Sequence, residues 1–305
     1  MDGILNILKP PGMTSFDVVA FLRGLTGVRK IGHVGTLDPM AAGVLPVCVG
    51  RATKAVEFLM EKDKIYRAEV VLGVTTDTQD TTGTVLDRKK PELSDNDIIQ
   101  AVASFRGKYM QLPPMYSALR VNGKKLYQLA REGIETERHR REVEIYSAEV
   151  LDIRRNDDIR VLLEVRCSKG TYIRTLCADI GDALGCGGCM SFLLRLKAGP
   201  FSISDSVTLE ELSGKKDEGA LEDLTIRIDR AFESFGSCVL DDNSERKFMN
   251  GMQVPLSQIR TDGNGGTDEV AGGLMRVYGC DGRFIALGMI IQKENGNYLK
   301  VKKFF

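Results

Sequence analysis

The chain is organised around the stretch Arg29-Lys30-Ile31-Gly32-His33-Val34-Gly35-Thr36-Leu37-Asp38-Pro39-Met40-Ala41-Ala42-Gly43-Val44-Leu45-Pro46. Its glycines, at positions 32, 35 and 43, permit positive φ and close backbone approach. Pro39 disfavours a helical conformation at Asp38. We therefore predict a rigid loop that displays His33 and Asp38, followed by an apolar run, Val44 to Val49, that enters the core. On its own, Asp-Pro in a glycine-rich segment is more often an ordinary turn.

The composition is that of a soluble globular protein. The chain has 305 residues, enough for one large domain or two, of which 43% are hydrophobic and 28% charged. Apolar runs stay below membrane-spanning length, and the first residues lack the basic-then-apolar order of a signal peptide. The seven cysteines are scattered, which favours free thiols in a reducing cytoplasm.

Motifs for metals and common cofactors are missing from the sequence. Cys186 and Cys189 have the spacing of half a zinc or redox motif, but the chain has only two histidines, so a glycine-rich turn is the simpler interpretation. The sequence also lacks a Ser-His-Asp set, a phosphate-binding loop and a dinucleotide fingerprint, which argues against familiar hydrolases, kinases and dehydrogenases. We predict no metal and no cofactor.

Hydrophobic periodicity predicts a mixture of strands and helices. The expected strands cover 2–8, 64–73, 143–154 and 159–167, and the last two form a hairpin. The expected helices cover about 16–24 (capped by Thr14 or Ser15), 53–60, 95–105 (capped by Ser94) and 172–184. After a domain boundary near residue 236, short extended pieces are expected at 237–240, 275–278, 284–292 and 298–301, with a loop at 262–268.

Basic residues are densest between Arg120 and Arg141, although the net charge of the chain is zero, with 42 basic and 42 acidic side chains. The cluster contains Arg120, Lys124, Lys125, Arg131, Arg138, Arg140 and Arg141. Glutamates are interspersed among these cations, so charge alone is as consistent with a solvated helix face as with a nucleic-acid-binding surface.

A few polar residues on apparent loops and strand ends could support chemistry together. A lone carboxylate in a rigid loop, such as Asp38, can act as a nucleophile or general base. An arginine such as Arg174 can pair with it and keep it ionised. Tyr66 and Tyr172 offer flat faces on which a base can stack. For a single tyrosine or arginine, packing is the better explanation, so the hypothesis depends on the joint occurrence of these residues.

Six motifs in order over residues 1–201 resemble the bacterial tRNA pseudouridine synthase B (TruB) family. They are Leu8-Lys9-Pro10-Pro11-Gly12-Met13-Thr14-Ser15, Lys30 to Pro46, Lys64-Ile65-Tyr66, Gln111-Leu112-Pro113-Pro114-Met115-Tyr116-Ser117-Ala118, Lys169-Gly170-Thr171-Tyr172-Ile173-Arg174-Thr175-Leu176 and Leu193-Leu194-Arg195. The tail more weakly resembles the PUA-type RNA-binding module of this family. The resemblance implies an α+β fold: a mixed, mainly antiparallel sheet in a catalytic domain (1–235, with a basic insertion at about 120–142) and a small β-rich module (236–305).

The resemblance also implies roles for individual residues. Asp38 matches the family's catalytic aspartate, Tyr66 the tyrosine that stacks on the target base, and Arg174 the arginine that pairs with the aspartate. We assign these as the catalytic residues. The residues predicted to bind substrate are His33, Lys9, Tyr172, Leu193, Arg138, Arg140 and Arg141.

The implied reaction is isomerisation of the T-loop uridine at tRNA position 55 to pseudouridine, without cofactor or metal. The N1–C1′ bond breaks, the uracil rotates, and it rejoins through C5; the carboxylate either adds to C1′ or abstracts the C2′ proton. The target base must leave the RNA stack. We expect a cytoplasmic monomer that binds the T arm and needs neither a protein partner nor a membrane.

Two alternatives remain open from the sequence. One is a guide-RNA-dependent synthase of the archaeal and eukaryotic type, against which the basic insertion argues. The other is a non-enzymatic tRNA-binding or tRNA-folding protein. Retention of Asp38 together with Arg174 argues against it, because folding RNA needs neither.

Overall fold

The structure is a computed structural model that describes residues 1–117, 119–121, 123–261 and 272–305. Ala118 of the fourth motif and the loop expected at 262–268 lie outside the described residues, as do the side chains of Arg120, Lys125 and Arg131. Within these ranges, no helix is long and apolar enough to cross a membrane.

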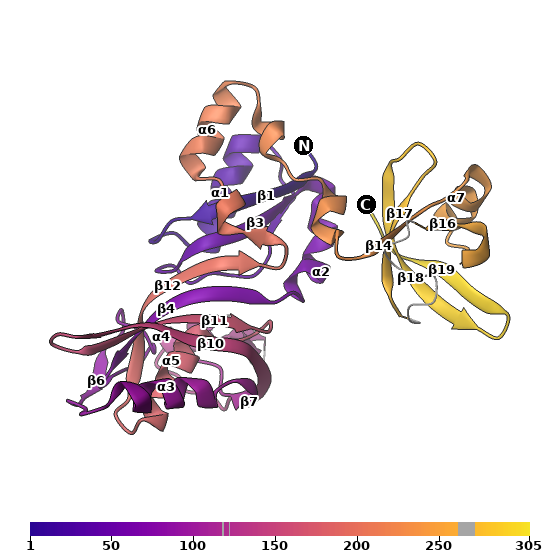
Figure 1. Ribbon diagram of the computed structural model, residues 1–305. Coiled ribbons are helices and arrows are strands. Elements are labelled where there is room, and N and C mark those ends of the chain that lie inside the picture. Colours follow the sequence, from indigo (N-terminus) through magenta and orange to yellow (C-terminus); the bar gives the residue numbers. More distant parts are fainter. Residues whose placement is uncertain (118, 122, 262–271) are drawn as a thin grey trace.

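One large sheet forms the body of the catalytic part, in the order β1-β3-β12-β4-β11-β10-β7 (Figure 1). Its strands are β1 (Gly3–Lys9), β3 (Ala42–Val49), β4 (Lys64–Leu72), β7 (Gly107–Gln111), β10 (Arg141–Arg155), β11 (Ile159–Cys167) and β12 (Gly188–Ala198). β2 (Ile31–His33) adds to β3, and β13 (Phe201–Ser202) adds to β12. Along this order only β3 and β12 pair in parallel, so the predicted mixed, mainly antiparallel sheet is confirmed among the described residues.

Alternation of side chains explains how the central strand lies in the sheet. In β4, Tyr66, Ala68 and Val70 are buried, whereas Arg67 and Glu69 are half-buried on the other face. β3 instead lies between β1 and β12 and is buried almost throughout, as expected for the apolar run after Asp38. Two small hairpins stand apart from the sheet: β5 (Val74–Thr76) with β6 (Val85–Arg88), and β8 (Arg120–Val121) with β9 (Lys124–Lys125).

Helices pack at the two ends of the large sheet, with α1 and α6 at one end and α3 and α5 at the other (Figure 1). The helices are α1 (Ser15–Thr26), α2 (Val56–Met60), α3 (Asp95–Ser104), α4 (Leu126–Arg131), α5 (Ile173–Ala183), α6 (Leu209–Asp217) and α7 (Asp242–Met249). Short 3-10 turns are η1 (Gly50–Ala55), η2 (Ile203–Asp205), η3 (Leu221–Leu224), η4 (Ile228–Phe232) and η5 (Leu256–Gln258).

Capping boxes fix where two helices begin. Thr14 and Asp17 bond each other's backbone at α1, and Ser94 and Asp97 do the same at α3. Thr14, not Ser15, is therefore the cap of α1. A further capping box at Thr208 and two buried leucines on one face support α6, whose last residues lie at the polar surface.

The C-terminal module is β-rich, as predicted, and its sheet runs in the order β15-β19-β18-β17-β14-β16. Its strands are β14 (Gly236–Val239), β15 (Val254–Pro255), β16 (Arg260–Thr261), β17 (Leu274–Tyr278), β18 (Phe284–Lys293) and β19 (Gly296–Phe304). The four extended pieces expected from the sequence correspond to β14, β17, β18 and β19. α7 was not predicted, since its sequence offers few apolar residues besides Phe248.

Aromatic side chains join this module to the catalytic part. Phe58 and Phe232 of the catalytic part pack in one apolar cluster with Phe284 and Phe305 of the module. The rings of Phe232 and Phe305 lie 5.9 Å apart, and those of Phe284 and Phe305 lie 5.3 Å apart. Aromatic pairs of this kind each contribute about 0.5–1.5 kcal/mol beyond burial, so the contact is a packed interface.

Candidate active site

Asp38 lies in the loop between β2 and β3, and α1 holds this loop in place. The hydroxyl of Ser15, at the start of α1, accepts a hydrogen bond from the Leu37 backbone N–H (2.9 Å) and donates one to the Leu37 carbonyl (3.2 Å). On the other side of Asp38, the Pro39 carbonyl accepts from the Gly12 N–H at 2.8 Å. The residues on both sides of Asp38 are therefore fixed, which confirms the expected rigid loop.

Lys9 is a third support for the loop. Its side chain is fully buried, and its ammonium donates to the carbonyls of Pro10 (2.8 Å), Met13 (2.6 Å) and Pro39 (3.2 Å). Burial lowers the pKa of Lys9 to about 8, although the nearby Asp38 opposes this shift. An ammonium has three hydrogens to donate, and carbonyls take all three. This geometry indicates that Lys9 positions the Asp38 loop, in place of the substrate contact predicted from the sequence.

Arg195 on β12 joins the two ends of the same loop. Its side chain is 1% exposed, its Nε donates to the Val44 carbonyl at 2.6 Å, and its Nη2 donates to the Gly35 carbonyl at 3.0 Å.

At Gly43 (φ 112°) a Cβ would stand 2.3 Å from the Arg195 carbonyl oxygen, so only glycine permits this approach of β3 to β12. Gly32, by contrast, is extended within β2 and uses no positive φ.

Arg174 in the first turn of α5 contacts Asp38 directly. Its Nε lies 2.8 Å from Oδ2 of Asp38, and its Nη2 donates to Oδ1 at 3.2 Å. The same guanidinium donates to the carbonyls of Tyr116 (2.9 Å) and Thr78 (3.1 Å) and lies 3.4 Å from Oδ2 of Asp80. Such two-point contact fixes the plane of the carboxylate as well as its position.

Asp80 is a site residue that the sequence analysis missed. It is 4% exposed, and its Oδ1 accepts hydrogen bonds from the Thr78 hydroxyl (2.8 Å) and from the backbone and hydroxyl of Thr82 (3.0 and 2.5 Å). The only signal in the sequence is an aspartate in a stretch rich in threonine. Nothing local reveals that this loop lies beside α5, which is more than 90 residues further along the chain.

The electrostatics of Asp38 follow from these neighbours. Burial raises the pKa of the Asp38 carboxyl, the guanidinium of Arg174 opposes the rise, and the second carboxylate, Asp80, adds to it. One third of the Asp38 side chain remains exposed to solvent. A carboxylate gripped on one edge and open on another can react with a ligand that enters from the open side.

Tyr66 and Leu193 lie on the neighbouring strands β4 and β12. Leu193 is opposite Ala68, and Arg195 is opposite Tyr66, in the register of the two strands. Tyr66 is 8% exposed and packs in the same apolar cluster as Leu193 and Leu37. Burial raises the pKa of the Tyr66 phenol, and the nearby Arg195 partly opposes this. The phenol is thus neutral, with its ring in an apolar wall.

His33 and Tyr172 complete the set around Asp38. His33 ends β2; burial and the charge of Arg195 lower its pKa, and its Nδ1 is buried without a hydrogen-bond partner in the described part of the chain. Tyr172 precedes Arg174 at the start of α5, where the amide of Gln111 holds its backbone. The structure therefore brings the residues predicted around the catalytic carboxylate into one region.

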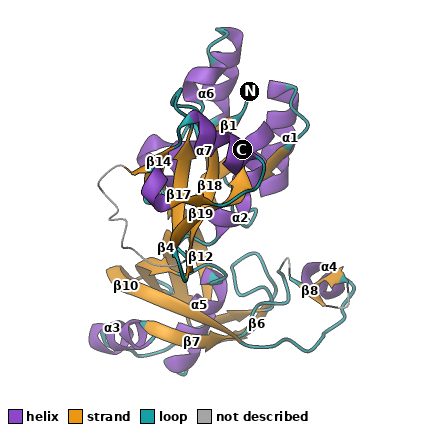
Figure 2. Ribbon diagram, turned by 90° about the vertical axis from the view of Figure 1, so that its right-hand side faces the viewer, coloured by secondary structure: helices purple, strands orange, loops and turns teal. Residues whose placement is uncertain are grey.

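The arginines of the insertion lie elsewhere, on the chain between β7 and β10. Figure 2 shows α4 and β8 reaching away from the large sheet in this segment. Arg138 donates to the Pro113 carbonyl and Arg140 to the Met110 carbonyl, both at 2.9 Å. Arg141 begins β10 and is exposed, and its charge lowers the raised pKa of Tyr172. The insertion thus adjoins the site at Tyr172.

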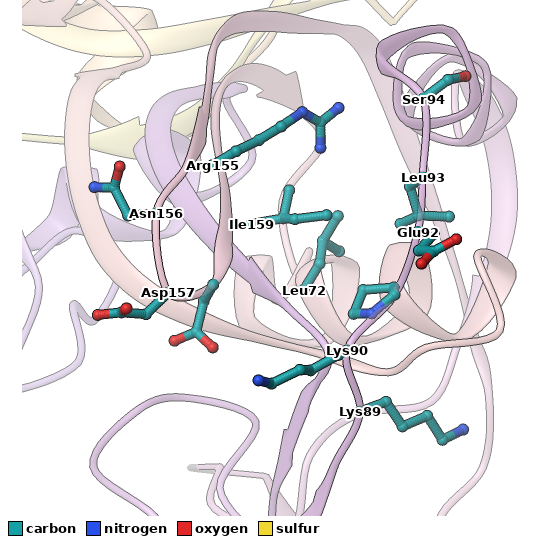
Figure 3. A pocket seen from close by; sticks show the side chains of 12 residues that line it. Leu72, Lys89, Lys90, Glu92, Leu93, Ser94, Arg155, Asn156, Asp157 and Ile159 are labelled. Carbon is teal, nitrogen blue, oxygen red and sulfur yellow. The ribbon is translucent and has the colours of Figure 1, made fainter.

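A separate cavity of about 680 Å³ lies between the β10–β11 turn and the segment that leads into α3 (Figure 3). Apolar Leu72 and Ile159 form its floor, and charged residues such as Lys90 and Asp157 surround them. The described residues that line it do not include Asp38, Tyr66 or Arg174. Its polar groups carry mixed charges at the surface, so the buried, convergent groups around Asp38 are the better candidate site.

Comparisons with known proteins identify the family of the chain. Residues 23–173 match the description TruB family pseudouridylate synthase (N terminal domain), and residues 174–233 match the tRNA pseudouridylate synthase B C-terminal domain. The tRNA pseudouridine synthase B of Alkaliphilus oremlandii (strain OhILAs) is 44% identical over 99% of this chain and 97% of that protein. The chain belongs to the TruB family. The tRNA pseudouridine synthase B of Clostridium kluyveri is a further relative, 47% identical over 95% of this TruB chain and 96% of that protein.

Solved structures show the same fold at lower identity. A chain of the Cbf5-Nop10-Gar1 complex superposes on this TruB-family chain with a TM-score of 0.74 and 29% identity, covering 99% of this chain and 84% of that one. A chain of an H/ACA RNP bound to a substrate RNA containing 2'-deoxyuridine gives the same TM-score with 27% identity. The predicted pseudouridine synthase fold is therefore confirmed for the TruB chain, including its β-rich C-terminal module.

Proposed function

We propose that this chain converts the uridine at position 55 of the tRNA T loop to pseudouridine, with Asp38 as the catalytic carboxylate. The observation that carries the proposal is the two-point contact between Arg174 and Asp38, in a loop held from three sides, in a chain of the TruB family. The relatives named tRNA pseudouridine synthase B supply the substrate class. A tRNA-modifying enzyme of this kind works where tRNA is found, in the cytoplasm.

We propose a task for each residue in this reaction. Arg174 keeps Asp38 ionised and oriented while the carboxylate attacks C1′ or removes the C2′ proton. As the N1–C1′ bond breaks, the uracil leaves with the electron pair, and the Tyr66 ring and Leu193 hold it while it turns. After C5 has bonded to C1′, the C5 proton must leave. Because the Tyr66 phenol is neutral, we propose that its oxygen accepts this proton while the phenol's own proton passes to water, so that the phenol ends the step neutral.

The other predicted groups bind RNA around this centre. His33, whose pKa burial lowers, contacts the flipped-out bases as a neutral imidazole. Tyr172 forms a second aromatic wall, and the insertion with Arg138, Arg140 and Arg141 grips the T-arm backbone as part of a monomeric enzyme. Base flipping of this kind requires both a pocket and contacts to the flanking strand.

Reaction of the purified protein alone with an unmodified tRNA transcript tests this function. We expect one pseudouridine per tRNA, at position 55, located by chemical sequencing of the product. Product that forms only when a guide RNA and protein partners are added would instead indicate the guide-dependent type. Tight tRNA binding without any isomerisation would indicate a non-enzymatic tRNA-binding protein.

Two variants of Tyr66 separate the ring from the hydroxyl. Tyr66→Phe keeps the stacking ring and should bind tRNA normally, but we expect the single-turnover rate to fall at least about a hundredfold, the usual scale of acid–base help. Tyr66→Leu should lose rate and also lose stacking worth on the order of 1–3 kcal/mol. Rapid-quench kinetics on both variants measure the single-turnover rate. A Phe variant near the wild-type rate would limit Tyr66 to stacking.

The salt dependence of binding tests the insertion. Replacing Arg138, Arg140 and Arg141 with alanine should weaken tRNA affinity and reduce the slope of log affinity against log salt by about 2–3, because fewer counterions are released. The matched control replaces Lys215 and Lys216 with alanine. Both lie on α6, which is distant from the insertion in Figure 2, so this variant should leave the slope unchanged. Equal slopes in all three proteins would identify the insertion as solvated surface only.

A further inference from the structure

Gln111 marks the point at which the insertion leaves the sheet. It is the last residue of β7, and its register partner is Arg141, the first residue of β10, so residues 112–140 form one excursion between these strands. Gln111 is 1% exposed. A fully buried amide needs partners for both its oxygen and its nitrogen, because an unpaired one is costly.

The Gln111 amide has three partners in the described part of the chain: the backbone N–H and carbonyl of Tyr172 at the start of α5, and the hydroxyl of Tyr109 on β7, to which Nε2 donates at 2.5 Å. Its Oε1 accepts from the backbone N–H of Tyr172 at 2.8 Å, and its Nε2 donates to the carbonyl of Tyr172 at 3.0 Å. Tyr172 occupies the N-cap position of α5, and its own side chain makes no capping hydrogen bond within the described part of the chain. The start of α5, which carries Tyr172 and Arg174, is therefore held by a side chain from a different element.

The residues on both sides of Gln111 contact the insertion and the candidate site. We call residues 110–117 the strap. Arg140 donates to the strap at the Met110 carbonyl and Arg138 at the Pro113 carbonyl, and the Tyr116 carbonyl accepts from Nη2 of Arg174 at 2.9 Å. One segment thus receives two arginines of the insertion and supports two residues of the site.

The strap has little regular structure of its own to fix its position. From Leu112 to Ser117 it forms no helix or strand, and Pro113 and Pro114 have no backbone N–H with which to join a sheet. Its first two residues belong to β7, and the Ser117 carbonyl accepts a backbone hydrogen bond from Tyr127 at 3.1 Å. Between these two points, side-chain contacts decide where the strap lies. Arg138 and Arg140 each use one guanidinium nitrogen on the strap, and a guanidinium has further N–H groups that can bind a phosphate at the same time.

We propose that Gln111 is a positioning residue that couples the grip on the RNA to the alignment of Tyr172 and Arg174. Phosphates that bind Arg138 and Arg140 order these arginines, the arginines fix the strap, and the strap fixes the start of α5 through Gln111 and the Tyr116 carbonyl. The inference rests on the proposed function, since it concerns how that reaction is aligned. Misplacement of a reacting group by about 1 Å can cost about a hundredfold in rate.

Gln111→Glu is the sharpest test because its effect depends on pH. An ionised glutamate keeps the acceptor for the Tyr172 N–H but loses the donor to the Tyr172 carbonyl, whereas a protonated one restores both. Burial raises the pKa of such a carboxyl. We expect the single-turnover rate, relative to wild type at the same pH, to fall about tenfold to a hundredfold at pH 8 and to recover towards pH 6, while tRNA affinity stays within about twofold.

Three controls separate positioning from general damage. Gln111→Leu removes both hydrogen bonds to Tyr172, together with the one to the Tyr109 hydroxyl, and should lose rate at every pH. Gln100→Glu makes the same chemical change at an exposed site on α3 and should behave as wild type. Hydrogen exchange should show that tRNA protects the Tyr172 amide in the wild type but not in Gln111→Leu, and urea unfolding checks that each variant is folded.

Coupling to the insertion is tested by combining variants. In the wild-type background, Arg138→Ala combined with Arg140→Ala should lower the single-turnover rate at saturating tRNA. In the Gln111→Leu background the same two substitutions should lower the rate much less, because rate losses are not additive when residues act through the same contacts. Equal losses in both backgrounds, or a wild-type rate in folded Gln111→Glu and Gln111→Leu, would overturn the proposal. Failure of the wild type itself to form pseudouridine would overturn the proposed function instead, and the exchange measurement would still report on the strap.

Discussion

Asp38→Asn is expected to abolish pseudouridine formation while tRNA affinity stays within about tenfold of wild type, or about 1.4 kcal/mol. Asparagine has nearly the size and shape of aspartate, so the loop held by Ser15, Lys9 and Arg195 keeps its path. An amide is a poor nucleophile and a poor base, and both routes open to Asp38 need an ionised carboxylate. We expect single-turnover rates below about one-thousandth of wild type, a scale typical for loss of an essential group.

The Asp38 experiment needs a check on folding, because the substitution also places an amide nitrogen or an uncharged oxygen against Arg174. Urea unfolding of the purified variant provides this check, and filter binding gives the tRNA affinity. Asp205→Asn, at an exposed site outside the large sheet, makes the same chemical change and should remain fully active. Substantial turnover by folded Asp38→Asn would falsify the assignment of Asp38.

Arg174→Met is expected to cost both stability and activity. It removes the one guanidinium that lies between Asp38 and Asp80 and leaves two carboxylates near each other. Removing one partner of a buried ion pair typically costs about 3–5 kcal/mol, and the exposed third of Asp38 should place this case towards the lower end. Denaturant titration measures the stability, and single-turnover kinetics measure the rate.

A second variant separates the two losses. Adding Asp80→Asn to Arg174→Met removes one of the unpaired charges and should recover part of the stability. It should not recover the rate, because Asp38 still lacks the group that orients it. If the rate returned together with the stability, Arg174 would act only by holding the fold.

The pH dependence of Arg174→Met follows from the same contacts. Burial and Asp80 raise the pKa of Asp38, and Arg174 opposes that rise. Without Arg174 the pKa of Asp38 rises further, so the acidic limb of the pH–rate profile should move to higher pH. The same rise affects folding, because the pKa of the Asp38 carboxyl is then higher in the folded state than in the unfolded state. Such a carboxyl contributes stability at pH values below its unfolded pKa. That contribution is lost as the pH rises through its folded pKa.

Local structure was predictable because its causes are local. Side-chain alternation predicted β4 and the β10–β11 hairpin to within a few residues, and polar caps placed the start of α1 at Thr14 or Ser15 and that of α3 at Ser94. The glycines and proline around Asp38 indicated a fixed loop. Each of these signals acts between residues only a few positions apart, so it can be read without knowing the fold.

Only the tertiary structure decided which groups meet. Asp80 and Arg174 are 94 positions apart, and nothing in either neighbourhood indicates that they share a site. Lys9 looks like any basic residue before a turn, yet burial beneath the Asp38 loop directs its ammonium to carbonyls. In the sequence, Gln111 is only one residue of a motif. It contacts Tyr172 in the structure, where β7 pairs with β10. The sequence gives the type of each side chain. The role of that side chain depends on its partners, and long-range strand pairing determines which partners it meets. Hydrophobic periodicity does not encode that pairing.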